Sequence, residues 1–162
     1  MRSKLFMAVL VGFVLILCTV PLSAAGPTEA ACALLTQARV SMVLGVPVDA
    51  GEPIAGRASS CQWTAKGKFA TLTITQPLGG KTPIERFNEG KKTLPGITVE
   101  PVSGVGDDAY YVYFANTKGP TTPMGLVVKK GSSSFEIRVY GFPSDQAKTI
   151  AKTLTQDVAT KL

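Results

Sequence analysis

The sequence predicts an α+β domain in which an antiparallel β-sheet of about five to six strands carries helices packed mainly on one face. Two stretches, 61–77 and 124–140, alternate apolar with polar residues around a central glycine, which is typical of hairpins with one solvated face. Apolar residues also recur at helical spacing in 37–44 and 145–158. Helices and hairpins that follow one another in this way favour the α+β class.

The composition indicates one folded domain. The chain has 162 residues, of which 45% are hydrophobic and 17% are charged, a balance found in globular and not in disordered proteins. The formal net charge is +6. A positive charge of this size fits either general solubility or anionic surroundings.

The chain begins with the pattern of an export signal. Two basic residues precede an apolar run at 5–20, and the small residues Ser23-Ala24-Ala25 follow it. We expect a signal peptide at 1–25, cleaved after Ala25 or, as the alternative, after Ala24. The remaining residues, 26–162, then form a single α+β domain in the periplasm or outside the cell.

The N-terminal segment has two alternative fates. The apolar run is slightly long for a signal peptide, so an uncleaved membrane anchor is the alternative. Lipid attachment at Cys18 is disfavoured, because Leu17 stands where a small residue should precede the modified cysteine.

Cysteine usage agrees with export. Removal of the signal takes Cys18 away and leaves Cys32 and Cys61, and two thiols in an exported chain favour a disulfide. The alternative is a pair of buried free cysteines. A redox function is disfavoured because the chain has no Cys-x-x-Cys motif.

The first helix is expected at about 37–44. Thr36 has the position of an N-cap, Gly45 follows the last helical residue, and Pro47 prevents continuation. A loop rich in glycine and proline is expected at 49–60.

The first hairpin, 61–77, turns at Lys66-Gly67. Ala70, Leu72 and Ile74 point to one side of its second strand, and the three alternate threonines point to the other. The sheet therefore has an apolar face that other segments must cover.

A second helix opens at Thr82-Pro83-Ile84-Glu85, which supplies the threonine, proline and glutamate of a capping box. Ile84, Phe87 and Leu94 mark its buried side, and Gly90 weakens its last turns. The second hairpin turns at Gly131. Further strands are expected at 97–102, 109–115, 124–129 and 134–140.

The final helix is expected from about Asp145, with Ser144 as its cap. It carries an apolar stripe along one side. The residues of this stripe are Ala147, Ile150, Ala151, Leu154 and Val158.

Most catalytic motifs are absent from the sequence. The chain contains no histidine, which excludes Ser-His-Asp and Cys-His nucleophile activation and histidine zinc sites. Gly80-Lys81-Thr82 resembles the end of a P-loop but lacks its first glycine, and 104–109 matches a dinucleotide-binding pattern but precedes a strand. We expect no catalytic residues, no cofactor and no metal site.

Asp107 and Asp108 are the candidate for carboxylate chemistry. Adjacent residues of an extended segment point in opposite directions, so a loop-capping function is favoured over a metal or acid–base site. An enzyme of unfamiliar type that uses these carboxylates with a lysine or a tyrosine is the alternative function.

Four short motifs are spread along the chain after the N-terminal segment. They are Cys32-x-Leu34-Leu35-Thr36, Leu44-Gly45-x-Pro47-Val48, Cys61-x-Trp63 and Gly104-Val105-Gly106-Asp107-Asp108-Ala109. With these motifs, most of this part of the chain resembles a group of bacterial exported proteins and lipoproteins whose domains have no assigned function, several of them from actinobacterial envelopes. The resemblance implies an envelope or secreted location and a paired Cys32 and Cys61, and it carries no catalytic residues. The lipid-attachment motif of the lipoproteins is missing at Cys18.

We therefore expect a non-enzymatic secreted or cell-envelope module that binds a protein, lipid or glycan partner. An anionic partner is favoured by the basic residues of the later strands. No nucleic acid is expected, because the basic pairs are not interleaved with aromatic residues. Contact with a membrane is expected only if the N-terminal segment is retained.

The expected ligand-binding residues are Tyr111, Tyr113, Lys129 and Arg138. In the strand 109–115 the more apolar alternate set, which begins at Tyr110, is expected to face the core. Tyr111 and Tyr113 are then left on the solvated side, where they offer a broad apolar body with a hydroxyl group. The alternative is that these tyrosines only pack against their neighbours.

Overall fold

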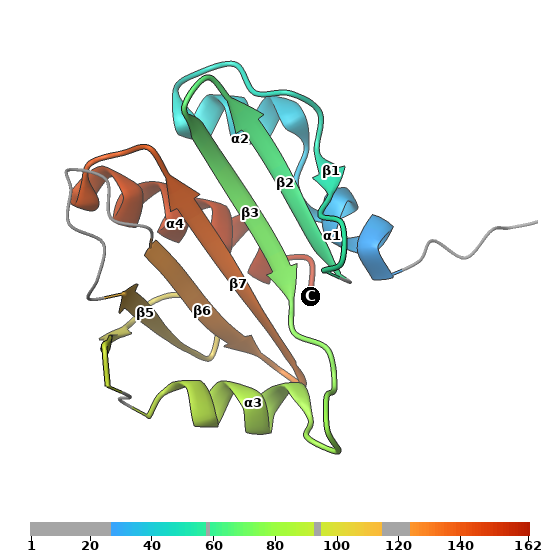
Figure 1. The fold of residues 1–162 in the computed structure, drawn as a ribbon, viewed down its shortest axis with the longest axis vertical. Helices are drawn as coiled ribbons and strands as arrows, with labels where there is room; N and C mark the ends of the chain where they lie inside the picture. Colours follow the sequence, from blue (N-terminus) through green and yellow to red (C-terminus); the bar gives the residue numbers. More distant parts are fainter. Residues whose placement is uncertain (1–26, 58, 93–94, 115–123) are drawn as a thin grey trace, which may run out of the picture.

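The computed structural model describes residues 27–57, 59–92, 95–114 and 124–162. Within these ranges it has the predicted α+β class, with one antiparallel sheet of seven strands and four helices. The strands are β1 (Glu52–Pro53), β2 (Ser60–Ala65), β3 (Lys68–Ile74), β4 (Ile97–Val102), β5 (Asp108–Phe114), β6 (Met124–Lys130) and β7 (Ser133–Tyr140). The helices are α1 (Pro27–Leu34), α2 (Gln37–Leu44), α3 (Pro83–Gly90) and α4 (Ser144–Ala159). The strand order across the sheet is β1-β2-β3-β7-β6-β5-β4 (Figure 1).

The strand number exceeds the expected five to six because the predicted loop at 49–60 contains β1. Its two residues pair with β2, where Glu52 lies opposite Gln62. A strand of two residues is too short to show an alternation of apolar and polar residues, so the sequence does not reveal it. Helix α1 is likewise not predicted from the sequence.

The first hairpin forms as predicted. Strands β2 and β3 pair on either side of Lys66-Gly67, and Gly67 has a φ of 71°, which favours glycine. Ala70 and Leu72 are buried on the apolar side. Strand β7 then pairs with β3 and places Ile137 opposite Leu72, so the two hairpins join at the centre of the sheet.

One face of the sheet, called here the covered face, carries the hydrophobic core. Cys61, Leu72, Ile137, Leu126 and Tyr111 follow one another across it, strand by strand. Helix α1 packs on β2 and β3, α4 packs on β6 and β7, and α2 packs on α4. The predicted stripe of α4 is confirmed, since all its members are buried: Ala147, Ile150, Ala151, Leu154 and Val158.

The opposite face, called here the open face, is covered only in part. Helix α3 lies against it, where the ring of Phe87 tilts against Tyr110 at a centroid distance of 5.0 Å. The Tyr110 hydroxyl donates a hydrogen bond to the Phe87 carbonyl at 3.2 Å. Helix α3 is therefore an exception to the prediction of helices mainly on one face, because Tyr110 requires apolar cover on this side. Figure 1 shows α3 well apart from α2 and α4.

Helix α3 begins with the predicted capping box. The Glu85 N–H donates to Thr82 Oγ1 at 3.2 Å, and the Thr82 N–H donates to Glu85 Oε2 at 2.8 Å. The bond from the Thr82 N–H, together with one from the Thr82 hydroxyl to the same oxygen at 2.9 Å, lowers the pKa of the Glu85 carboxyl. Gly90 packs against the Tyr110 hydroxyl, which leaves no room for a Cβ at this position. Packing therefore requires a glycine here, although glycine weakens the helix. Leu94, expected on the buried side, lies outside the described residues.

The predicted disulfide between Cys32 and Cys61 is present and joins α1 to β2, with a Cα–Cα distance of 5.1 Å. The predicted signal peptide at 1–25 lies outside the described residues. In the part of the chain that is described, no helix has both the length and the apolar character needed to cross a bilayer.

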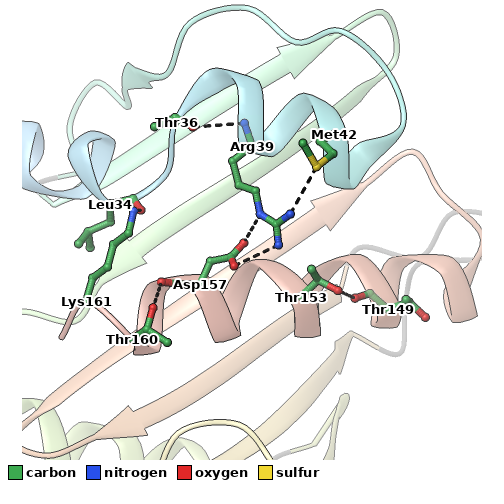
Figure 2. Close-up of polar contacts among 9 residues, drawn as sticks. All are labelled: Leu34, Thr36, Arg39, Met42, Thr149, Thr153, Asp157, Thr160 and Lys161. Atoms are coloured by element: carbon green, nitrogen blue, oxygen red, sulfur yellow. Dashed lines mark hydrogen bonds and ion pairs between the residues drawn. The ribbon is translucent and has the colours of Figure 1, made fainter.

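An ion pair holds α2 to α4 on the covered face (Figure 2). Arg39 donates two hydrogen bonds to the carboxylate of Asp157, at 2.7 and 3.1 Å.

The predicted N-cap of α2 is confirmed, since Thr36 Oγ1 accepts from the Arg39 N–H at 3.2 Å. The predicted cap of α4 is wrong: Ser144 is its first helical residue, and Pro143 holds the cap position without a side-chain bond.

Candidate functional site

The four residues predicted to bind a ligand do not share one face. Tyr111 is only 6% exposed and belongs to the core of the covered face, and Tyr113 packs against that core. Lys129 of β6 and Arg138 of β7 alternate with the residues that point to the covered face, so they lie on the open face. The prediction that the tyrosines line the same solvated side as Arg138 is therefore wrong. Helices cover both sides of the sheet near β5, so residues on both faces of this strand are buried. The more apolar of the two alternate sets therefore did not identify the side that faces the main core.

Tyr111 and Tyr113 use their hydroxyls and rings within the fold. The Tyr113 hydroxyl donates to Glu100 Oε2 at 2.6 Å, and Lys148 Nζ lies 3.2 Å from the same oxygen. Lys148 also lies 5.4 and 5.3 Å from the two ring centroids. The bonds from Tyr113 and Lys148 lower the pKa of Glu100, while burial raises the pKa of Tyr113. This cluster ties α4 to β4 and β5.

Asp107 and Asp108 bind different partners. The Asp107 carboxylate accepts from the Gly131 N–H at 2.7 Å and from Lys130 Nζ at 3.3 Å, and the first of these lowers its pKa most. Asp108 accepts from Lys91 Nζ at 2.7 Å. Asp107 therefore stabilises the turn at Gly131, and Asp108 binds the lysine at the end of α3. Both contacts agree with the predicted loop-capping function. Within the described ranges, no three side chains of metal-binding type gather.

The open face is hollowed between β1 and α3. One hollow of about 550 Å³ and another of about 650 Å³ share Arg57 and Arg138 in their linings. The first is lined by hydroxyl and amide side chains and by apolar residues in similar number, with Arg86 of α3 and Glu136 of β7. The second includes an aromatic pair. We call the two together the arginine groove, defined by Arg57, Arg86, Arg138, Gln62, Thr71, Thr73, Phe69 and Tyr140.

The register of the sheet builds the floor of the arginine groove. Thr71 of β3 lies between Gln62 of β2 and Arg138 of β7, so the three form a row across the strands. At the next pair of the same face, Phe69 of β3 lies opposite Tyr140 of β7. Their rings stack with a centroid distance of 4.9 Å and an interplanar angle of 15°. The floor is therefore polar in its centre and aromatic at one end.

The three arginines are held in different ways. Arg138 Nε donates to Glu136 Oε1 at 2.7 Å, and Arg86 donates to the Gln76 carbonyl at 2.6 Å. Arg57 is exposed in the segment after β1, and no described residue accepts a hydrogen bond from its guanidinium. Three positive charges thus face one carboxylate in the described lining, which makes the groove electropositive.

Sequence reasoning identified Arg138 and missed Arg57 and Arg86. Alternation along β3 and β7 placed the threonines and Arg138 on the solvated side, and this is confirmed. No local pattern indicates that β3 and β7 are neighbours, or that Arg57 and Arg86 reach the same hollow from a loop and a helix. The groove becomes visible only in the assembled sheet.

The resemblance to exported bacterial proteins stays a prediction. The interpretation of the arginine groove rests on its own geometry and charge. No protein-family model, no curated protein and no solved structure matches this chain.

Proposed function

We propose that this chain is an exported, non-enzymatic binding module whose arginine groove takes an anionic partner. The observation that carries this proposal is the gathering of Arg57, Arg86 and Arg138 around one hollowed face, with Glu136 as the one carboxylate of the described lining. Guanidinium groups stay charged at physiological pH and bind carboxylates and phosphates through paired N–H donors. Three such groups around one face fit an acidic ligand.

Binding without catalysis is supported by how the acidic residues are used. Asp107 holds the turn at Gly131, and Asp108 is paired with Lys91. Glu136, the one carboxylate of the described groove lining, is paired with Arg138. These carboxylates stabilise the fold and orient an arginine, and each is already engaged by a partner within the fold.

Export is supported by the N-terminal pattern and by the disulfide, which persists in oxidising compartments. The intact mass of protein purified from its own host should correspond to a chain that begins at Gly26 or Ala25. Recovery of the full-length chain in the membrane fraction would contradict the proposed cleavage.

The proposed groove is tested with dextran sulfate, a generic polyanion, at physiological salt. The double variant Arg57→Gln/Arg138→Gln should bind it at least about tenfold more weakly, as expected from the loss of charge-assisted hydrogen bonds. The matched control is Lys92→Gln/Lys152→Gln, which removes the same charge from residues outside both hollow linings. Equal losses in the two variants would show that the protein binds polyanions through its net charge alone, and would overturn the proposal.

A further inference from the structure

We infer that the natural class of ligand for the arginine groove is an acidic glycan, a chain of sugars that carry carboxylates. This inference rests on the proposed function and names its partner. The extent of the groove, the chemistry of its floor and the aromatic pair at its end favour such a ligand.

The groove is extended and its charge lies at the centre. The hollows of about 550 and 650 Å³ meet at Arg57 and Arg138, so bound ligand would reach to both sides of these arginines. Each hollow alone has the size of a small-molecule site. An inorganic ion would fill only the centre, whereas a short oligomer with repeated acidic units fits the whole length.

The floor offers side chains that both donate and accept hydrogen bonds. Gln62, Thr71 and Thr73 lie on neighbouring strands of the open face and line the hollows. Hydroxyl and amide groups match the hydroxyls of a sugar, which also donate and accept. An acyl chain lying over these three residues would remove them from water without replacing their hydrogen bonds, so the centre of the floor disfavours a lipid tail.

One end of the groove carries an aromatic platform. Phe69 and Tyr140 stack on each other, and Tyr140 remains 36% exposed. Aromatic rings have electron-rich faces and slightly positive edges, and they pack favourably on the C–H side of a sugar ring. A stacked pair beside guanidinium groups therefore suits a ligand in which flat C–H faces and carboxylates alternate.

The position of the groove on a sheet face disfavours a peptide. The backbone groups of β2, β3 and β7 are paired within the sheet, so an extended peptide finds no free strand edge here. Recognition must come from side chains. Those present provide charge, hydroxyl partners and an aromatic surface.

The test is calorimetric titration of the folded protein with three probes: trigalacturonic acid, the neutral sugar maltotriose and the acidic peptide triglutamate. Trigalacturonic acid should bind best. Arg57→Gln should weaken its binding about tenfold, because a charge-assisted hydrogen bond is lost. Tyr140→Ala should weaken it about fivefold through loss of the ring, while Tyr140→Phe should retain the affinity. Lys152→Gln is the control and should bind like the unaltered protein.

The outcomes separate this inference from the proposed function. Triglutamate that binds as tightly as trigalacturonic acid, with the same dependence on Arg57, would overturn the glycan assignment and leave anion binding intact. Equal binding of maltotriose would overturn it as well, since charge would then be unnecessary. If neither these probes nor dextran sulfate bind in a manner that depends on Arg57, both proposals are wrong. Melting temperatures of all variants should stay near that of the unaltered protein, which excludes unfolding as the cause of a loss.

Discussion

Removal of the disulfide should lower the stability of this domain substantially. The bond joins Cys32 of α1 to Cys61 of β2, and Cys61 is fully buried against the core. The suitable perturbation is the double variant Cys32→Ala/Cys61→Ala, because alanine leaves no free thiol and buries no unpaired polar group. Without the bond, α1 is held to the sheet by packing alone.

The magnitude follows from the length of the closed loop. The bonded residues are 29 positions apart. In the chain-entropy model a loop of this length makes the disulfide worth about 3.6 kcal/mol at 25 °C. A domain of this size shifts its melting temperature by about 3–4 °C for each kcal/mol, so we expect a fall of about 12 °C. Because natural domains are stable by only about 5–15 kcal/mol, the loss is a large fraction of the total.

The assay is urea unfolding followed by the fluorescence of Trp63, the single tryptophan, which is buried on β2 beside Cys61. The unaltered protein should lose about 3.6 kcal/mol of unfolding free energy when a reductant is added. The double variant serves as the matched control and should not respond to the reductant. A loss below about 1 kcal/mol, far under the chain-entropy value, would refute the reasoning that this bond restrains the unfolded chain.

Four further predictions concern single residues. Tyr111→Ser should cost about 3–5 kcal/mol in urea unfolding, because the side chain is buried in the core; a loss below about 1 kcal/mol would show that it is exposed. Burial raises the pKa of Tyr110 to about 12, above its value in the unfolded chain, so stability should be full below about pH 10 and fall as the pH rises toward 12. Urea midpoints between those pH values should decline less in Tyr110→Phe, and an unchanged slope would contradict this. Thr82→Ala should cost about 1 kcal/mol by removing the cap of α3, while Thr82→Ser should keep it in the same assay. Ser59→Gly should raise the melting temperature, with a gain of about 0.5–1 kcal/mol, because Ser59 has a φ of 65° and a buried hydroxyl without a described partner; a lower melting temperature would speak against strain at this position.

Features that depend on near neighbours in the chain could be predicted from the sequence. The capping box at Thr82 and Glu85 involves residues within one helical turn, and the turn at Gly67 is enforced by its backbone conformation. The alternation in β3 identified which side of the first hairpin is buried. The disulfide could be predicted because removal of the expected signal peptide would leave Cys32 and Cys61 as the two remaining thiols.

Features that depend on distant segments could not be predicted. Tyr110 and Tyr111 are both buried, one under α3 and the other under α4, and alternation alone cannot describe a strand covered on both sides. The arginine groove needs β3 beside β7, and it also needs Arg57 and Arg86 to reach one face from elements that carry no pattern of their own. Charge in the sequence indicated an anionic partner but not the surface that would bind it.

The central claim, that the arginine groove is the ligand site, is tested most directly by NMR of the arginine Nε–Hε groups during titration with trigalacturonic acid. Arg57 and Arg138 line the groove, whereas Arg39 is bonded to Asp157 on the covered face and provides a control in the same spectrum. The account predicts that the resonances of Arg57 and Arg138 shift with added ligand while that of Arg39 stays in place. A shift of all three together, or of Arg39 alone, would contradict it.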